Sequence, residues 1–148
     1  MEKENEMSIV ARITAAVVLI PVLIFGLYIV IHGHLTPGGG FPGGAVMATG
    51  VVMFLVVFGN LKGINDQLFI LLESIGLIGF ALLAFLGLPK GFFNNFLANT
   101  NGIFGMSVGF GTNPGYLNTG GVIPLMNMAV GLEVFAALSL IVFIMFKR

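Results

Sequence analysis

Four long apolar runs constrain this chain more than any other feature. They cover approximately residues 9–31, 43–59, 67–88 and 123–146. A helix of about 17 to 25 apolar residues crosses a hydrocarbon core of about 30 Å. Because lipid offers no hydrogen-bond partners, each run must form a helix that satisfies its own backbone groups. The sequence therefore predicts an all-α integral membrane protein, with four transmembrane helices in a single domain over residues 1–148.

The composition supports a lipid environment and excludes several functions. Of 148 residues, 57% are hydrophobic and 8% are charged, whereas roughly a quarter of the residues in a soluble domain are charged. The formal net charge is zero and no basic run occurs, which argues against a nucleic-acid partner. Cysteine is absent, so this chain forms no disulfide and ligates no iron–sulfur cluster through thiolates. No nucleophile–base pair or phosphate loop is recognisable, and we expect no enzyme activity and no cofactor in this chain alone.

The first apolar run has a competing interpretation as a signal peptide. It is longer than the roughly 7–15 apolar residues typical of such a peptide, and Pro37-Gly-Gly-Gly follows it instead of a small-residue cleavage site. We expect it to be retained as a helix.

The charges that flank the helices predict the orientation. An even number of spans leaves both termini on one side, together with the turn between the second and third helices. That side carries Lys3, Arg12, Lys62, Lys147 and Arg148, whereas the other side carries Lys90. The positive-inside rule then places both termini in the cytoplasm of a multi-pass protein of the cell membrane.

A long outer loop is expected between the third and fourth helices, at about residues 89–122. It is rich in glycine and asparagine, and contains no Asp, Glu, Lys, Arg or His after Lys90. Its phenylalanines are Phe92, Phe93, Phe96, Phe104 and Phe110. Since these rings would expose a large apolar area, we expect the loop to fold onto the bilayer or a neighbouring subunit. A mobile glycine-rich loop is the alternative.

Two acidic residues fall within the hydrocarbon zone. Glu133 lies about 15 Å along the fourth predicted helix, near the bilayer midplane, and Glu73 lies about 9 Å along the third. An ionised acid at the midplane costs at least about 2.5–3.5 kcal/mol, so it faces a wet cavity, finds a partner or stays protonated. Both are candidates for handling ions or protons. The alternative is a neutral acid that hydrogen-bonds a neighbouring helix and fixes subunit packing.

Two histidines close the first helix at the predicted outer surface. His32 and His34 could relay protons near neutral pH. The competing interpretation is that they cap free carbonyls at the helix end. Without a nearby cysteine or acid they supply too few donors for a metal site.

The most distinctive local feature is a glycine-rich segment. It consists of Pro37, Gly38, Gly39, Gly40, Phe41, Pro42, Gly43 and Gly44. It contains the spacing Gly-x-Gly-x-x-Gly, but a dinucleotide site needs a preceding strand, and here an apolar helix precedes it. The glycines allow two backbones to approach closely. Free amides at the start of the second helix could instead face an anion or a partner's carboxylate.

The segment from His32 to Gly44 resembles the Arg-Gly-His-Asn-x-Pro-Gly-Gly-Gly-Phe-x-Gly-Gly signature of the MrpB (MnhB) family. These proteins are subunits of multisubunit Na+/H+ antiporters, and related subunits occur in archaeal membrane-bound hydrogenases and sulfane-sulfur reductases. His32 stands in place of the usual Arg, and Leu35 in place of Asn. The antiporters often have Asp where Asn127 stands, whereas this chain has Glu133 further into the helix. These departures favour the archaeal respiratory branch.

The resemblance implies a non-catalytic subunit of a module that translocates Na+ and H+. Its partners would be other Mrp-like membrane subunits, and iron–sulfur clusters and a nickel–iron site could lie in partner subunits of a redox-driven complex. One alternative is a subunit of a stand-alone Mrp-type antiporter, and a second is a purely structural subunit. A third is a small transporter that works alone.

Overall fold

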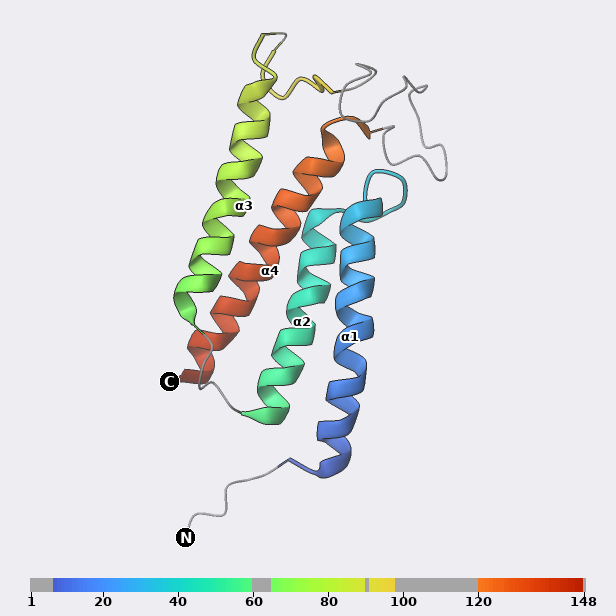
Figure 1. Cartoon of the computed structure of the whole chain (residues 1–148), viewed down its shortest axis with the longest axis vertical. Helices are drawn as coiled ribbons and strands as arrows, with labels where there is room; N and C mark the ends of the chain where they lie inside the picture. The colour runs from blue at the N-terminus through green and yellow to red at the C-terminus, as the bar shows by residue number, and fades with distance from the viewer. Residues whose placement is uncertain (1–6, 60–64, 90, 98–119, 148) are drawn as a thin grey trace.

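The computed structural model describes residues 7–59, 65–89, 91–97 and 120–147. Four helices make up the fold: α1 (Ile9–His32), α2 (Gly40–Phe58), α3 (Asp66–Leu86) and α4 (Ile123–Lys147) (Figure 1). Each is long and apolar enough to cross a membrane. The expected all-α fold with four transmembrane helices is confirmed.

Local capping explains where two of the helices begin. The Ser8 side chain accepts a hydrogen bond of 3.3 Å from the Ala11 amide at the start of α1. Asn65 does the same for the Gln67 amide at 3.0 Å before α3. Such side chains satisfy amides that have no partner within the first helical turn.

The second helix begins at Gly40, three residues before the predicted start. Pro42 lies in the first turn, where the missing amide hydrogen costs nothing. Gly39 precedes the helix with φ of 144°, a conformation that favours glycine. The helical part of the glycine-rich segment therefore begins at Gly40 instead of the expected Gly43.

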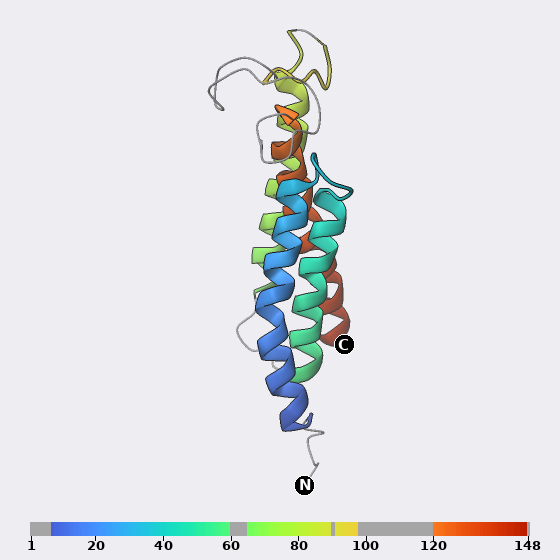
Figure 2. The same cartoon turned by 90° about the vertical axis from the view of Figure 1, so that its right-hand side faces the viewer.

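The helices lie side by side in a shallow, curved row whose order differs from the order in the chain. From one edge to the other the row runs α3, α4, α2, α1 (Figure 1), and its narrow profile is visible in Figure 2. The row curves enough for α1 to touch α4 as well. The start of α1 and the end of α4 lie at the same end of the molecule (Figure 1), as four spans require.

Glycines bring α2 against helices on both of its sides. A methyl group at Gly44 would lie 2.6 Å from the carbonyl oxygen of Gly131 in α4, and one at Gly43 would lie 2.7 Å from the carbonyl oxygen of Gly26 in α1. Gly40 makes a similarly close approach to Asn127. Since Gly40 and Gly44 are four residues apart, they form the small-residue face that membrane helices use for tight packing.

The edge helix α3 packs chiefly against α4. Its two buried residues are Gly76 and Ala84. Near the start of α3, the Phe69 ring lies 6.5 Å from the Phe135 ring and 6.4 Å from the Phe143 ring, both in α4. The Lys147 ammonium pairs with Asp66 at 2.6 Å, so an exposed ion pair links the start of α3 to the end of α4.

The described part of the outer loop folds back on its own helices. The Phe93 ring packs 5.8 Å from that of Phe80 in α3. The Asn95 amide donates to the Gly120 carbonyl at 3.0 Å, and its oxygen accepts from the Val122 amide at 2.8 Å. Packing of the loop on lipid or another subunit stays a prediction, because Phe104 and Phe110 lie outside the described residues.

Candidate functional site

Glu133 occupies the middle of α4, where it meets α3. It lies ten residues after Ile123, which corresponds to about 15 Å along the helix. A methyl group at Gly76 would lie 2.9 Å from the Glu133 Cβ and 2.8 Å from its amide nitrogen. The absence of a side chain at Gly76 is therefore what lets α3 approach α4 at this acid.

Glu73 lies close to the same crossing. It precedes Gly76 by three residues, and residues three apart share a side of a helix. Both carboxylates are half-buried. Glu73 is about 10 Å along α3 from Asp66, on the predicted cytoplasmic side of Glu133. The fold thus places the two predicted candidates about one helical turn apart in depth, on adjacent helices.

No basic side chain neutralises these acids within the described ranges. The described lysine and arginine residues are Arg12 and Lys147. The Arg12 guanidinium lies 5.9 Å from the centre of the Phe58 ring, and Lys147 pairs with Asp66. In this part of the chain neither Glu73 nor Glu133 has an ion pair or a side-chain hydrogen bond. A counter-charge, a bound ion or a proton must then come from outside it.

The two histidines have different surroundings. The Nδ1 of His32 lies 3.2 Å from the Tyr28 carbonyl oxygen, and its ring stacks on the Tyr28 ring at 4.2 Å. The His32 ring thus contacts a carbonyl within the last turns of its own helix. His34 lies against Gly120 at the start of α4, and both of its ring nitrogens are buried without a hydrogen-bond partner in the described structure. His34 therefore has no polar partner among the described residues, whereas His32 does.

Asn127 is a polar residue that sequence reasoning did not place at a site. Its amide nitrogen is buried and unpaired within the described part of the chain. A methyl group at Gly33 would lie 3.0 Å from that nitrogen, and one at Gly39 would lie 3.7 Å from the amide oxygen. The side chain thus faces the loop that joins α1 to α2. An amide inside an otherwise apolar run was the signal available in the sequence.

Comparison with known proteins identifies the family. Residues 10–140 match the family described as a domain related to the MnhB subunit of Na+/H+ antiporter. The chain belongs to the MnhB family. The matched range includes both acids, both histidines and the whole glycine-rich segment, and it agrees with the expectation of an antiporter subunit that is not an enzyme by itself.

Two similar proteins are longer than the region that each shares with this chain. An uncharacterized protein of Methanocaldococcus jannaschii is 37% identical over 122 residues, which are 81% of this chain and 45% of that protein. A Staphylococcus aureus protein assigned as antiporter subunit mnhB2 is 32% identical over 77 residues, which are 52% of each chain. The alignments therefore span about half the length of these relatives.

A solved structure with a similar fold belongs to an archaeal complex. A chain in the structure of the membrane-bound sulfane sulfur reductase, described as an archaeal respiratory membrane complex, superposes with a TM-score of 0.82 and 34% identity. The superposition covers 97% of this chain and 60% of that one. A chain with this four-helix fold thus occurs within a membrane complex.

Proposed function

We propose that this chain is a non-catalytic subunit of an Na+/H+-translocating module in the cell membrane, and that Glu133 handles the transported proton or sodium ion. The parent assembly in this proposal is an archaeal redox-driven complex, in which partner subunits hold the iron–sulfur clusters and any nickel–iron site. The family match and the similarity to a respiratory complex support this placement.

The position of Glu133 carries the proposal. It sits mid-helix at the α3–α4 crossing without an ion pair or hydrogen bond in the described structure. An acid at such depth is kept only where it has a partner or a wet pathway. Glu73, one turn closer to the predicted cytoplasmic side, would pass the ion to or from that side. His34 would serve at the outer end, where its ring nitrogens have no hydrogen-bond partner among the residues that the structure describes.

Two other functions use the same residues differently. In a stand-alone Mrp-type antiporter the subunit would act in the same way without a redox arm. In a purely structural subunit the two acids would hydrogen-bond neighbouring subunits and fix their packing.

The deciding experiment replaces Glu133 by glutamine in the intact complex. We expect Glu133→Gln to abolish sodium uptake into sealed membrane vesicles while the complex is recovered in normal amount, because the amide keeps the shape but cannot exchange a proton. Glu73→Gln should slow uptake less severely, since water reaches that acid more easily. The readouts are radioactive sodium uptake and the yield of the purified complex.

Matched outcomes separate the alternatives. If Glu133→Gln prevented assembly and no transport defect could be separated from that loss, the structural function would replace this one. If the purified chain alone carried sodium in vesicles, the chain would be a transporter by itself. Iron–sulfur or nickel-bearing partners in the purified complex would distinguish the redox-driven assembly from the stand-alone antiporter.

A further inference from the structure

The two acids of the proposed ion path lie on the same side of the contact between α3 and α4. Each residue of a helix is turned by about 100° from the one before it. Relative to Gly76, which faces α4, Glu73 is therefore turned by about 60° in one direction and Gly79 by about 60° in the other. On α4, Glu133 and Leu132 are likewise turned to opposite sides of the residue that contacts Gly76.

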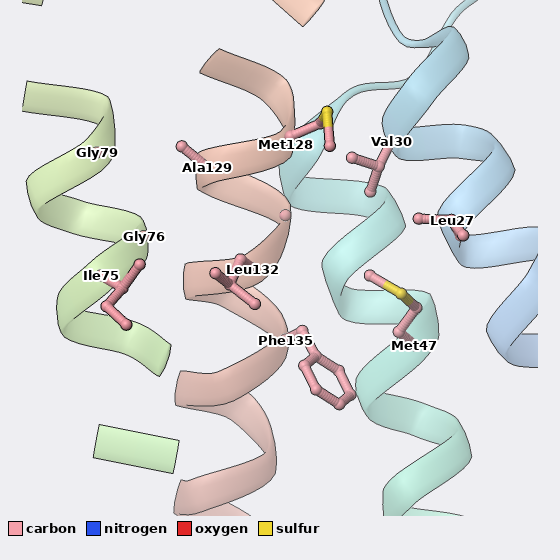
Figure 3. A pocket seen from close by; sticks show the side chains of 11 residues that line it. Leu27, Val30, Met47, Ile75, Gly76, Gly79, Met128, Ala129, Leu132 and Phe135 are labelled. Carbon is pink, nitrogen blue, oxygen red and sulfur yellow. The ribbon is translucent and has the colours of Figure 1, made fainter. Parts of the chain in front are cut away.

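Gly79 and Leu132 identify the other side of this contact. Both line an apolar hollow on one face of the helix row, between α3 and α4 (Figure 3). Neither Glu73 nor Glu133 is among the residues that line it. The two acids therefore lie together on the face that points away from the hollow.

The backbone of α3 contacts the part of Glu133 that cannot rotate. A methyl group at Gly76 would lie 2.8 Å from the Glu133 amide nitrogen and 2.9 Å from its Cβ. The backbone of α4 fixes both atoms, and the rest of the side chain extends from them. Since non-bonded atoms rest about 3.5–4.0 Å apart, a methyl group at this position would move α3 away from Glu133 by about 1 Å.

Such a movement would also change the distance between the two acids. Glu73 precedes Gly76 by three residues, so the same turn of α3 carries both. A shift of α3 away from α4 therefore moves Glu73 away from Glu133 and leaves both carboxyl groups chemically unchanged. Functional groups must be held within about 0.5 Å of their working geometry, and the expected shift is larger than this.

We infer that Gly76 is a positioning residue for the transfer of an ion between Glu73 and Glu133. The absence of a side chain at Gly76 holds α3 at the distance from α4 at which the two carboxyl groups exchange the ion. This inference rests on the proposed function, because it requires Glu133 to handle the ion. It adds that a residue without any ionisable group sets the separation of the two acids.

The first test changes the distance between the helices and keeps both acids. We expect Gly76→Ala in the intact complex to raise the sodium concentration for half-maximal uptake into sealed vesicles about tenfold. The matched control is Gly79→Ala, because a methyl group there would meet only the Ala129 Cβ, at 3.9 Å. Gly79→Ala should leave the half-maximal concentration unchanged. A glycine needed only for packing would change the yield of the complex, but not this concentration for the complexes that assemble.

The second test asks whether Gly76 acts through Glu73. In the Glu73→Gln variant, which should retain slow uptake, Gly76→Ala should produce no further rise in the half-maximal sodium concentration. The reason is that the carboxyl group that the shift of α3 would displace is already absent. Effects of the two substitutions that simply add would show that they act independently.

A third variant decides the question even if Gly76→Ala does not assemble. Glu73→Asp keeps the carboxyl group but shortens the side chain by one carbon–carbon bond, or about 1.5 Å. It does not alter the contact at Gly76. We expect it to raise the half-maximal sodium concentration as Gly76→Ala does.

Four outcomes would overturn the inference. They are an unchanged half-maximal concentration in assembled Gly76→Ala, an equal rise in Gly79→Ala, simple addition of the Gly76→Ala and Glu73→Gln effects, and wild-type uptake by Glu73→Asp. Normal uptake by Glu133→Gln would refute the proposed function as well. Loss of uptake in Glu133→Gln together with any of the four outcomes would refute the positioning role only.

Discussion

Asn95 secures the outer end of α4 with a single side chain. Its oxygen accepts from the Val122 amide and its nitrogen donates to the Gly120 carbonyl. Val122 is 1% exposed, so its amide cannot turn to water if Asn95 is lost. An unsatisfied buried amide costs about 1–3 kcal/mol.

We therefore expect Asn95→Ala to lower the free energy of unfolding of the purified complex by about 1–3 kcal/mol, measured as a lower unfolding temperature. The adjacent Asn94→Ala is the matched control, because the Asn94 side chain makes no hydrogen bond in the described structure. Equal stability of the two variants would show that the Asn95 bonds contribute nothing measurable.

At the scale of single residues, the sequence predicts which side chains could bind ions, but not which of them lie close together. The acids at 73 and 133 stand out because charge within an apolar run is costly. Their shared crossing at Gly76 could not be foreseen, since it depends on the register between α3 and α4. Asn95 was also hidden, because one asparagine among several in a glycine-rich loop carries no distinguishing pattern.

At the scale of helices, two glycines of α3 differ sharply in their surroundings. A methyl group at Gly76 would lie 2.7 Å from the Ala129 carbonyl oxygen, whereas one at Gly79 would be 3.9 Å from the Ala129 Cβ. The first distance requires the two backbones to move apart, and the second is ordinary van der Waals contact. Between α3 and α4, alanine is therefore tolerated at position 79 but not at position 76.

Gly76→Ala should lower the free energy of unfolding of the complex by about 1–3 kcal/mol, because the added methyl group overpacks the contact. Gly79→Ala should leave it unchanged or raise it slightly, because alanine is the better helix former. Thermal unfolding of the two purified complexes measures the contrast. A similar loss for both would mean that α3 does not approach α4 as closely as described.

The helix pattern was foreseeable because long apolar runs have few alternatives in lipid. The start of α2 was misplaced by three residues, since glycine is a poor helix former and a glycine-rich run does not show where a helix begins. The packing of α2 against both α1 and α4 depends on glycines on two sides of the helix. Which helix each glycine contacts could not be predicted before the arrangement of the helices was known.

For the whole molecule, the orientation in the membrane stays a prediction from charge counting, and some of the counted cations lie outside the described residues. The absence of cysteine from the sequence allows a clean test. Ser8→Cys and Thr36→Cys introduce single thiols at exposed positions near opposite ends of α1.

In intact cells we expect a membrane-impermeant maleimide to label Thr36→Cys and not Ser8→Cys. After the membrane is permeabilised, both variants should react. Labelling of Ser8→Cys alone in intact cells would invert the topology and would exchange the inner and outer assignments of Glu73 and His34.

The mismatch between chain order and spatial order has a consequence for biogenesis. A ribosome delivers α1 and α2 first, and these two already contact each other along their length. The next helix, α3, enters the bilayer before its main neighbour has been synthesised. The last helix, α4, must therefore insert between α2 and α3, which are already in the membrane. Translation halted before residue 123 would leave α3 without its principal neighbour.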